Sequence, residues 1–358
     1  MKQKRRRRFS ASPAHNKNNR MNRICFLFFT LTLTQLSAFS QSSDTKTPQE
    51  TARAFTRQGD YTNALVVLNE ALKKDPQNLE LNKDIAFNYY LEKEYDRGAT
   101  IARALIERPD ADVASYQILA LIYKATDQFK ECEKLYRGGL KRYPKSGALY
   151  NEYGEMLWSR DDRDAIKQWE KGIQIDPNYS TNYYNASRYY FRAGDNVWSL
   201  LYGETFLNLE SYSKRTAEIK ELVLDGYKKL FTEADMQKNE DMGNPFVGAY
   251  LNIIGKLSFT MAQGISTESL TVLRTKFILN WFETYPSNFP FRLFDHERQL
   301  LKEGMFDAYN QWLFGPTENL TVFQAWCTAH SDDYTRFINF QKGRIFKLPE
   351  GQYYQTVK

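Results

Sequence analysis

Small residues return about every 34 positions along the first part of this 358-residue chain. One row consists of Ala52, Ala86, Ala120, Gly154 and Ser187, and a second consists of Ala64, Gly98, Cys132, Ala165 and Ser199. A third row marks the ends of the same units with Pro76, Pro109, Pro144 and Pro177. A period of this length, combined with helical spacing of the apolar residues, predicts a stacked array of helix pairs. Such arrays mostly bind other proteins.

The periodic part of the chain divides into five units. They cover residues 45–78, 79–111, 113–146, 147–179 and 180–213. In each unit we expect a first helix, a polar turn such as Gly59-Asp60, and a second helix, which in four units ends near a proline. We expect the small residues where the two helices of a pair come within reach of each other's backbone.

This pattern resembles the tetratricopeptide repeat family. The residues that carry the resemblance are Gly59 to Leu65 and Ala71 to Pro76 in unit 1, and Tyr116, Leu119, Ala120, Tyr123, Phe129, Tyr136, Leu140 and Pro144 in unit 3. Units 2 and 4 run one residue short, and unit 5 lacks the closing proline. The resemblance covers residues 45–213 and implies an all-α, right-handed solenoid of about five helix pairs.

The chain after the repeats no longer keeps the period. Residues 214–231 have the spacing of a capping helix, which a solenoid needs over its last apolar face, and residues 232–244 form a polar linker. Residues 245–358 are rich in aromatic residues and predict a helical C-terminal domain. We expect its helices near 246–261, 266–285, 292–313 and 317–329, with an extended tail at 344–348.

The first 40 residues have the pattern of a secretory signal peptide. A basic start is followed by an apolar run from Ile24 to Ala38, and a small-x-small sequence then favours cleavage after Ser40. Met21 is an alternative start, which would make residues 1–20 an upstream extension. We therefore expect an exported protein in a bacterial periplasm, not membrane-spanning after cleavage, with residues 41–47 as a linker to the repeats.

The net charge of +6 comes from this N-terminal segment. Nine of the 49 basic residues lie in the first 40 positions, which contain no Asp or Glu, so the rest has 40 basic and 43 acidic residues. Nucleic-acid binding requires clustered positive charge, and the body of the chain has none. We therefore expect no nucleic-acid partner.

Few residues in the exported part suit catalysis or metal binding. Its two histidines are His296 and His330, and its two cysteines are Cys132 and Cys327, whose pairing the sequence leaves open. Asp295, His296 and Glu297 are adjacent, so they point to different helix faces and predict a solvated surface. Cys327 and His330 would share a helical face, but no third orienting group is placed beside them. We expect no catalytic residue, no metal site and no cofactor.

The resemblance also implies a binding surface, because in the family the first helices of successive units line a concave groove. Carried over by register, its residues are Arg53, Arg57, Lys83, Phe87, Tyr90, Gln117, Leu121, Lys124, Asn151, Glu155, Trp158, Tyr184, Arg188, Phe191 and Arg192. Cations that alternate with aromatic rings suit an extended peptide segment with acidic and apolar side chains.

These observations favour a non-enzymatic scaffold or adaptor that grips a segment of another cell-envelope protein. One alternative is an enzyme or small-ligand binder with its site in residues 245–358, carried by Cys327, His330 and the tryptophans. Another is that the aromatic groove residues pack against residues 245–358 and leave no open groove. Self-association through the ends of the solenoid is a further possibility.

Overall fold

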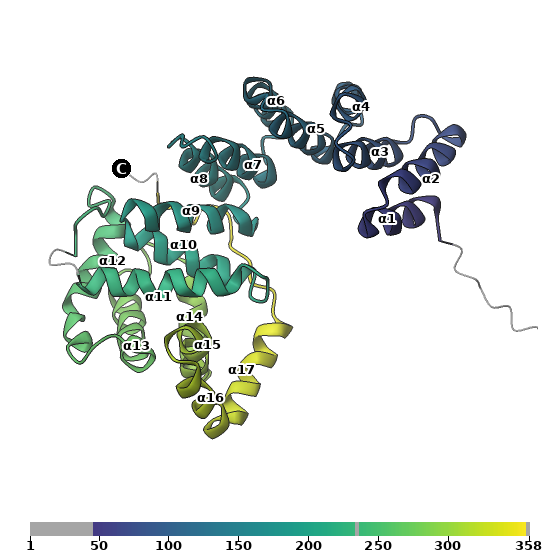
Figure 1. Cartoon of the computed structure of the whole chain (residues 1–358). Helices are drawn as coiled ribbons and strands as arrows, with labels where there is room; N and C mark the ends of the chain where they lie inside the picture. The colour runs from purple at the N-terminus through teal and green to yellow at the C-terminus, as the bar shows by residue number, and fades with distance from the viewer. Residues whose placement is uncertain (1–45, 233–235, 356–358) are drawn as a thin grey trace, which may run out of the picture. The chain divides into compact units, whose positions relative to one another are not determined.

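The computed structural model describes residues 46–232 and 236–355, in which every regular element is helical (Figure 1). The expected all-α fold class is confirmed. The predicted signal peptide lies outside the described residues, so it stays a prediction. Within the described ranges, no helix combines the length and the apolar character that crossing a bilayer requires.

The repeats form five consecutive helix pairs, each inside one predicted unit (Figure 1). The pairs are α1 (Pro48–Gln58) with α2 (Tyr61–Lys74), α3 (Leu79–Leu91) with α4 (Tyr95–Glu107), α5 (Val113–Ala125) with α6 (Phe129–Arg142), α7 (Gly147–Trp158) with α8 (Ala165–Ile175), and α9 (Ser180–Ala193) with α10 (Asn196–Leu209). Each first helix contacts its partner and also the first helix of the next pair. This is the packing of a tetratricopeptide-like solenoid.

The turn inside every pair has the same backbone conformation. A left-handed φ between +55° and +84° occurs at Gly59, Lys93, Asp127, Asp161 and Gly194. The N–H of the following residue donates to the carbonyl five residues earlier, as from Asp60 to Phe55 and from Asp162 to Leu157, both at 3.0 Å. These are Schellman C-caps, which satisfy the last carbonyls of the first helix and reverse the chain.

The two rows of small residues face each other inside the pairs, as expected. Ser187 Oγ donates to the backbone carbonyl of Ser199 at 2.8 Å, and Ser199 Oγ donates to that of Ser187 at 3.1 Å. At Gly154, an added Cβ would lie 2.4 Å from the Trp169 Nε1 atom. The small residues therefore allow backbones to approach so closely that a partner side chain contacts the main chain.

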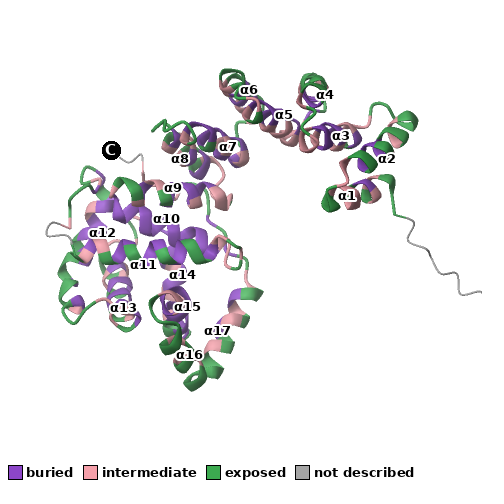
Figure 2. Ribbon diagram, in the orientation of Figure 1, coloured by how far each residue is buried: buried purple, intermediate pink, exposed green. Residues whose placement is uncertain are grey.

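The helix α11 (Thr216–Thr232) covers α10 and part of α9, as the predicted capping helix should. All residues of α10 from Asn196 to Asn208 are buried (Figure 2). A helix that is buried on every side needs partners beyond its own pair. The C-terminal region supplies these partners.

The C-terminal region is helical, as expected. Its elements are α12 (Pro245–Lys256), the 3-10 helix η1 (Ser258–Met261), α13 (Thr267–Thr284), α14 (Arg292–Lys302), α15 (Phe306–Glu318), α16 (Leu320–Ala329) and α17 (Ser331–Gly343). The single helix expected near 292–313 is wrong, because the chain turns at Gly304 with a φ of +66° and forms two helices. The sequence did not indicate α17.

The tail after α17 returns to the last repeats. The Leu348 backbone N–H donates to Asn178 Oδ1 at 2.9 Å, and Asn178 Nδ2 donates to the Leu348 carbonyl at 3.1 Å. The Tyr354 ring stacks on Phe246 at a centroid distance of 4.6 Å. Two segments 170 residues apart in the sequence are therefore held together by paired hydrogen bonds.

A charged cluster lies in the core that α10 shares with the C-terminal helices. Arg274 on α13 is 2% exposed and forms ion pairs with Glu204 on α10 and Glu297 on α14. Arg274 Nη1 also donates to Asn310 Oδ1 at 2.5 Å, and Tyr309 Oη donates to Glu204 Oε1 at 2.7 Å. Burying these charges is tolerable because the arginine lies between two carboxylates and both Arg274 and Glu204 have further hydrogen-bond partners.

Candidate partner-binding groove

The predicted groove residues come from α1, α3, α5, α7 and α9, which contact one another in sequence order. They fall into three groups with different surroundings: one near the start of the repeats, one in the middle, and one near the end.

Near the start of the repeats, Arg53, Arg57 and Phe87 line one cavity of about 260 Å³. Arg53 pairs with Asp84 at 3.2 Å, whereas Arg57 forms no ion pair within the described residues. Phe87 stacks with Tyr90 at a centroid distance of 6.0 Å. This end offers a free guanidinium beside apolar surface.

Lys83 has a different role from its register neighbours. It is 6% exposed and forms ion pairs with Glu80 at 2.6 Å and with Asp112 at 2.5 Å. Its charge is therefore neutralised by two exposed carboxylates, and the pair with Asp112 ties unit 2 to the N-cap of α5.

The middle of the surface carries carboxylates. Gln117 Nε2 donates to Glu152 Oε1 at 2.5 Å, and burial raises the pKa of Glu152. Asn151 is buried and donates to Glu155 Oε1 at 3.0 Å, and Asn185 donates to the same oxygen at 3.1 Å. Leu121 and Lys124 are half-buried on α5. This part of the surface therefore differs from the alternation of cations and aromatics that the sequence suggested.

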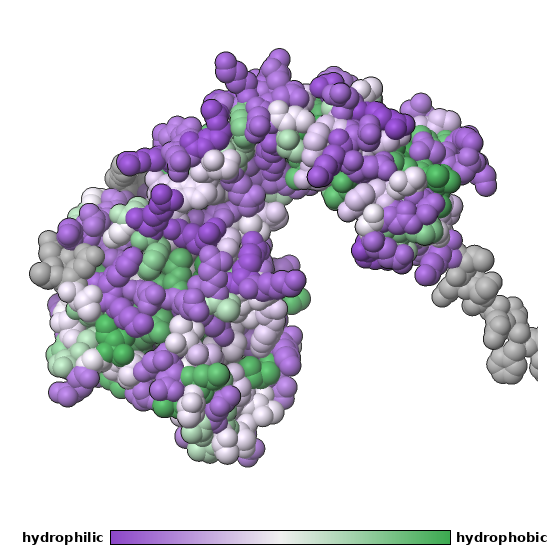
Figure 3. Space-filling model, in the orientation of Figure 1, coloured by the Kyte–Doolittle hydropathy of each residue, from purple (hydrophilic) through white to green (hydrophobic). Residues whose placement is uncertain are grey.

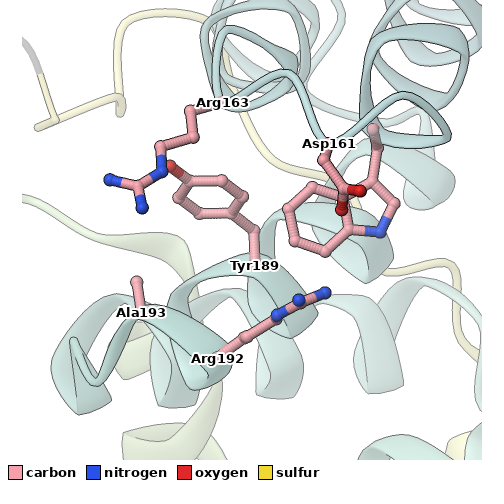
Figure 4. A pocket seen from close by; sticks show the side chains of 6 residues that line it. Asp161, Arg163, Tyr189, Arg192 and Ala193 are labelled. Carbon is pink, nitrogen blue, oxygen red and sulfur yellow. The ribbon is translucent and has the colours of Figure 1, made fainter.

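Near the end of the repeats, Trp158 and Arg192 meet. The Arg192 guanidinium lies 5.2 Å from the centroid of a Trp158 ring, and both residues line a cavity of about 470 Å³. Asp161, Arg163, Tyr189 and Ala193 complete the lining. Figure 4 shows Arg163 and Arg192 on either side of Tyr189. Neither arginine forms an ion pair within the described residues, so both guanidiniums are available to a carboxylate.

Arg163, Tyr189 and Asp161 were not among the predicted residues. Arg163 and Asp161 lie between α7 and α8, and Tyr189 follows Arg188 on α9. The prediction by register took residues only from the first helix of each pair. It therefore did not include Asp161 and Arg163, which lie in the turn next to Trp158.

Tyr184, Arg188 and Phe191 face the capping helix. Tyr184 Oη donates to Glu218 at 2.6 Å, Arg188 pairs with the same carboxylate at 2.9 Å, and Lys229 Nζ lies 3.5 Å from the Phe191 ring centroid. The sequence left open that aromatic groove residues pack against residues 245–358. The contacts of Tyr184, Arg188 and Phe191 described here come instead from α11.

The rival site at Cys327 and His330 has little support in the geometry. Cys327 is a free cysteine, and burial raises the pKa of its thiol. His330 stacks on Trp326 at 4.5 Å, and its Nδ1 lies 3.0 Å from the Trp326 carbonyl oxygen. Cys132 is also free, and it is buried. Within the described residues, no group of three or more potential ligands could hold a metal ion.

The expected solvated surface at Asp295, His296 and Glu297 is wrong for two of the three residues. His296 is fully buried and Glu297 is 3% exposed. His296 stacks on Phe340, and burial, with help from Arg344 and Arg292, lowers its pKa to about 2. Phe340 of α17 and Phe346 of the tail, which the sequence pattern did not place here, cover His296, whereas Glu297 is buried by its ion pair with Arg274.

A comparison with protein families matches residues 55–122 to the tetratricopeptide repeat. No curated protein is similar enough to count as a relative. Among solved structures, the crystal structure of MamA is 19% identical, covers 45% of this chain and 94% of its own, and has a TM-score of 0.37. A thermophilic tetratricopeptide repeat protein of Thermus thermophilus is 15% identical, covers 51% and 97%, and has a TM-score of 0.39. These likenesses do not indicate what the chain binds.

Proposed function

We propose that this chain, which carries tetratricopeptide repeats, is a non-enzymatic scaffold that holds an extended segment of another cell-envelope protein across its first helices. The role of a protein-interaction scaffold follows from the repeats. The export and the envelope partner rest on the pattern of residues 1–40.

One observation carries the proposal: both ends of the surface have a cavity with an arginine that forms no ion pair among the described residues and lies beside aromatic rings. Arg57 lies near Phe87 at one end, and Arg192 lies over Trp158 at the other. Arginine pairs with carboxylates in a two-point geometry, and aromatic rings offer apolar area at a low entropy cost. The partner segment therefore has acidic and apolar residues toward its two ends.

The middle of the surface refines the expected partner. Glu155 accepts hydrogen bonds from two asparagines, and Glu152 is held by Gln117 and Tyr136. Like charges placed opposite each other weaken association. The central part of the partner segment should therefore carry amides or a cation rather than carboxylates.

The test is crosslinking and affinity capture from the native envelope with protein that starts at Gln41. The test variant is Arg57→Glu with Arg192→Glu, and the matched control is Lys74→Glu with Lys141→Glu, which makes the same charge change on second helices. We expect the parent and the control to capture one partner, and the test variant to lose it.

Three outcomes would count against the proposal. Capture by the test variant would move the site away from these helices, and no capture by any protein would contradict a scaffold. Loss of the partner in a Cys327→Ala, His330→Ala variant would favour the rival site. The export proposal is tested separately, by sequencing the N-terminus of the protein recovered from the periplasmic fraction.

A further inference from the structure

Lys220, on the capping helix α11, is a buried lysine without a carboxylate partner. It is 8% exposed and forms no ion pair within the described residues. Lys83 in the repeats is buried to a similar degree but pairs with Glu80 and Asp112. A buried ammonium normally has such a counter-ion, because removing a charge from water is costly.

The neighbouring helix explains why a lysine lies at this position. Pro316 is inside α15 and has no N–H, so it leaves the carbonyl of Trp312, four residues earlier, without its helical donor. Lys220 Nζ donates to this carbonyl at 2.6 Å and lies 3.7 Å from the centroid of a Trp312 ring. This hydrogen bond uses one of the three N–H groups of the Lys220 ammonium. The positive charge of Lys220 has no carboxylate counter-ion among the described residues.

The lysine lines a cavity of about 520 Å³ between α11 and α15. Five of its ten lining residues carry hydroxyl groups: Ser211, Tyr212, Ser213 and Thr216 come from the start of α11 and the segment before it, and Thr317 comes from α15. Trp312 and Pro316 supply apolar surface, and Glu221 is the one acidic residue of the lining. Burial alone lowers the pKa of Lys220 to about 7, so Glu221 does not act as its counter-ion.

We propose that this cavity binds a small organic anion, a carboxylate or a phosphate, whose charge balances the Lys220 ammonium and whose oxygens accept hydrogen bonds from the hydroxyls of Tyr212 and Thr317. The hydroxyls of Ser211 and Thr216 already donate to the carbonyls of Leu207 and Glu210, so they shape the cavity without binding the anion. The Trp312 ring gives the rest of the ligand an apolar wall. The site lies outside the proposed partner-binding surface, so it does not depend on that proposal.

A bound anion favours the charged lysine. Binding should therefore take up a proton between about pH 7 and pH 9, and it should weaken as the pH rises. Two other titratable groups line the cavity, Tyr212 just before α11 and Glu221 on α11. The residues that α15 contributes to the lining, Trp312, Pro316 and Thr317, have no titratable group.

The test is isothermal titration calorimetry at pH 7.5 with inorganic phosphate and, separately, phenylacetate, in two buffers with different ionisation enthalpies. We expect one probe to bind with proton uptake, and the stronger probe distinguishes a phosphate site from a carboxylate site. Lys220→Met should weaken binding about tenfold or more, because a charge-assisted hydrogen bond is lost. The matched control Lys228→Met changes an exposed lysine of the same helix and should bind as the parent does.

Two further variants keep the test valid if Lys220→Met does not fold. Ala217→Glu adds a carboxylate to the lining without touching the contact between Lys220 and Trp312, and it should abolish binding. Glu221→Gln removes a repulsive charge and should strengthen binding. The proposal is overturned if neither probe binds the parent at millimolar concentration, or if Lys220→Met or Ala217→Glu binds as tightly as the parent.

Discussion

The repeats and the C-terminal region bury their helices in different ways. In the repeats, helices approach each other across positions where only a small residue fits, and this contact recurs from unit to unit at Ala52, Ala86, Ala120 and Ser187, which are at most 1% exposed. In the C-terminal region, the core is built around one charged cluster at Arg274 and many aromatic rings. The contacts of that core join residues far apart in the sequence, such as Glu204 with Arg274 and with Tyr309.

The surfaces differ as well (Figure 3). Most of the large apolar side chains that stay exposed in the described residues follow the repeats. Those after residue 245 are Phe259, Val272, Leu279, Leu320, Val322 and Ile345, whereas the repeat units contribute Val66 and Tyr212. A substitution in one repeat should mainly affect that unit and its neighbours, because each unit contacts mainly its neighbours. A substitution in the C-terminal core should affect the stability of the whole core, because its contacts are not repeated elsewhere.

The sharpest test of this contrast is Arg274→Met. The substitution leaves Glu204 and Glu297 buried without their cation, so we expect the free energy of unfolding to fall by about 3–5 kcal/mol. Urea unfolding followed by circular dichroism measures the change. Arg298→Met, which removes an exposed ion pair with Asp295, should cost less than about 1 kcal/mol. Equal losses in both variants would show that the cluster does not hold the C-terminal core.

In the repeats, Gly154→Ala should cost about 1–3 kcal/mol, because the new Cβ collides with Trp169 and displaces its hydrogen bond to the Asn151 carbonyl. Gly138→Ala is the matched control on α6, where an added Cβ meets nothing within 4 Å. There we expect a gain of about 0.5–1 kcal/mol, because alanine favours the helix. Thermal unfolding of both variants checks the signs, and a destabilised Gly138→Ala would contradict this account of the small residues.

The start of α10, where the two regions meet, should respond to pH. Asp195 accepts from the Trp198 N–H and Glu240 accepts from the Asn196 and Val197 N–H groups, so two buried carboxylates share one helix end. Burial and the charge of Glu240 raise the pKa of Asp195 to about 9. Because the folded state holds this proton more tightly, its contribution to stability is lost as the pH rises from about 4 to about 9.

Asp195→Asn mimics the protonated acid and should remove this pH dependence. Relative to the parent, we expect the variant to gain about 1–2 kcal/mol between pH 5 and pH 8.5. Urea unfolding at both pH values gives the difference. Glu240→Gln should likewise reduce the loss of unfolding free energy between pH 5 and pH 8.5. If the difference in unfolding free energy between parent and variant is the same at both pH values for both variants, the two carboxylates do not share a proton.

The smallest effect is expected at His296, whose two ring nitrogens are buried and have no hydrogen-bond partner among the described residues. His296→Leu removes this unsatisfied group, so we expect a change of about 0–1 kcal/mol in favour of the variant at pH 7. Because the pKa of His296 is lowered from 6.5, the parent loses stability as the pH falls below about 6.5. The advantage of the variant should therefore grow toward pH 4, and a constant difference would contradict the buried, neutral state.

The sequence predicted the repeats well because their contacts are local and recur. Ala120 and Cys132 are twelve residues apart, and the same pair of positions returns in every unit, so the spacing itself indicates which residues touch. The turn at Gly304 escaped prediction because a lone glycine does not distinguish a helix interior from a helix end.

The C-terminal core could not be predicted from spacing. Glu204 meets Arg274 across 70 residues and Tyr309 across 105, and no periodicity links these positions. The groove residues were predicted by register, but Lys83 and Asn151 are buried, and the family pattern does not indicate which polar side chains pair internally. Tyr189 and Arg163 were missed because neither fits the register rule.

The return of the tail to Asn178 has a consequence for how the chain is made. Units 1 to 4 can form one after another as they are synthesised, since each contacts mainly its neighbours. Unit 5 cannot bury α10 until the C-terminal helices exist, and Asn178 gains its partner Leu348 only after the segment that follows α17 has been made. The last repeat should therefore be the part that chaperones hold longest.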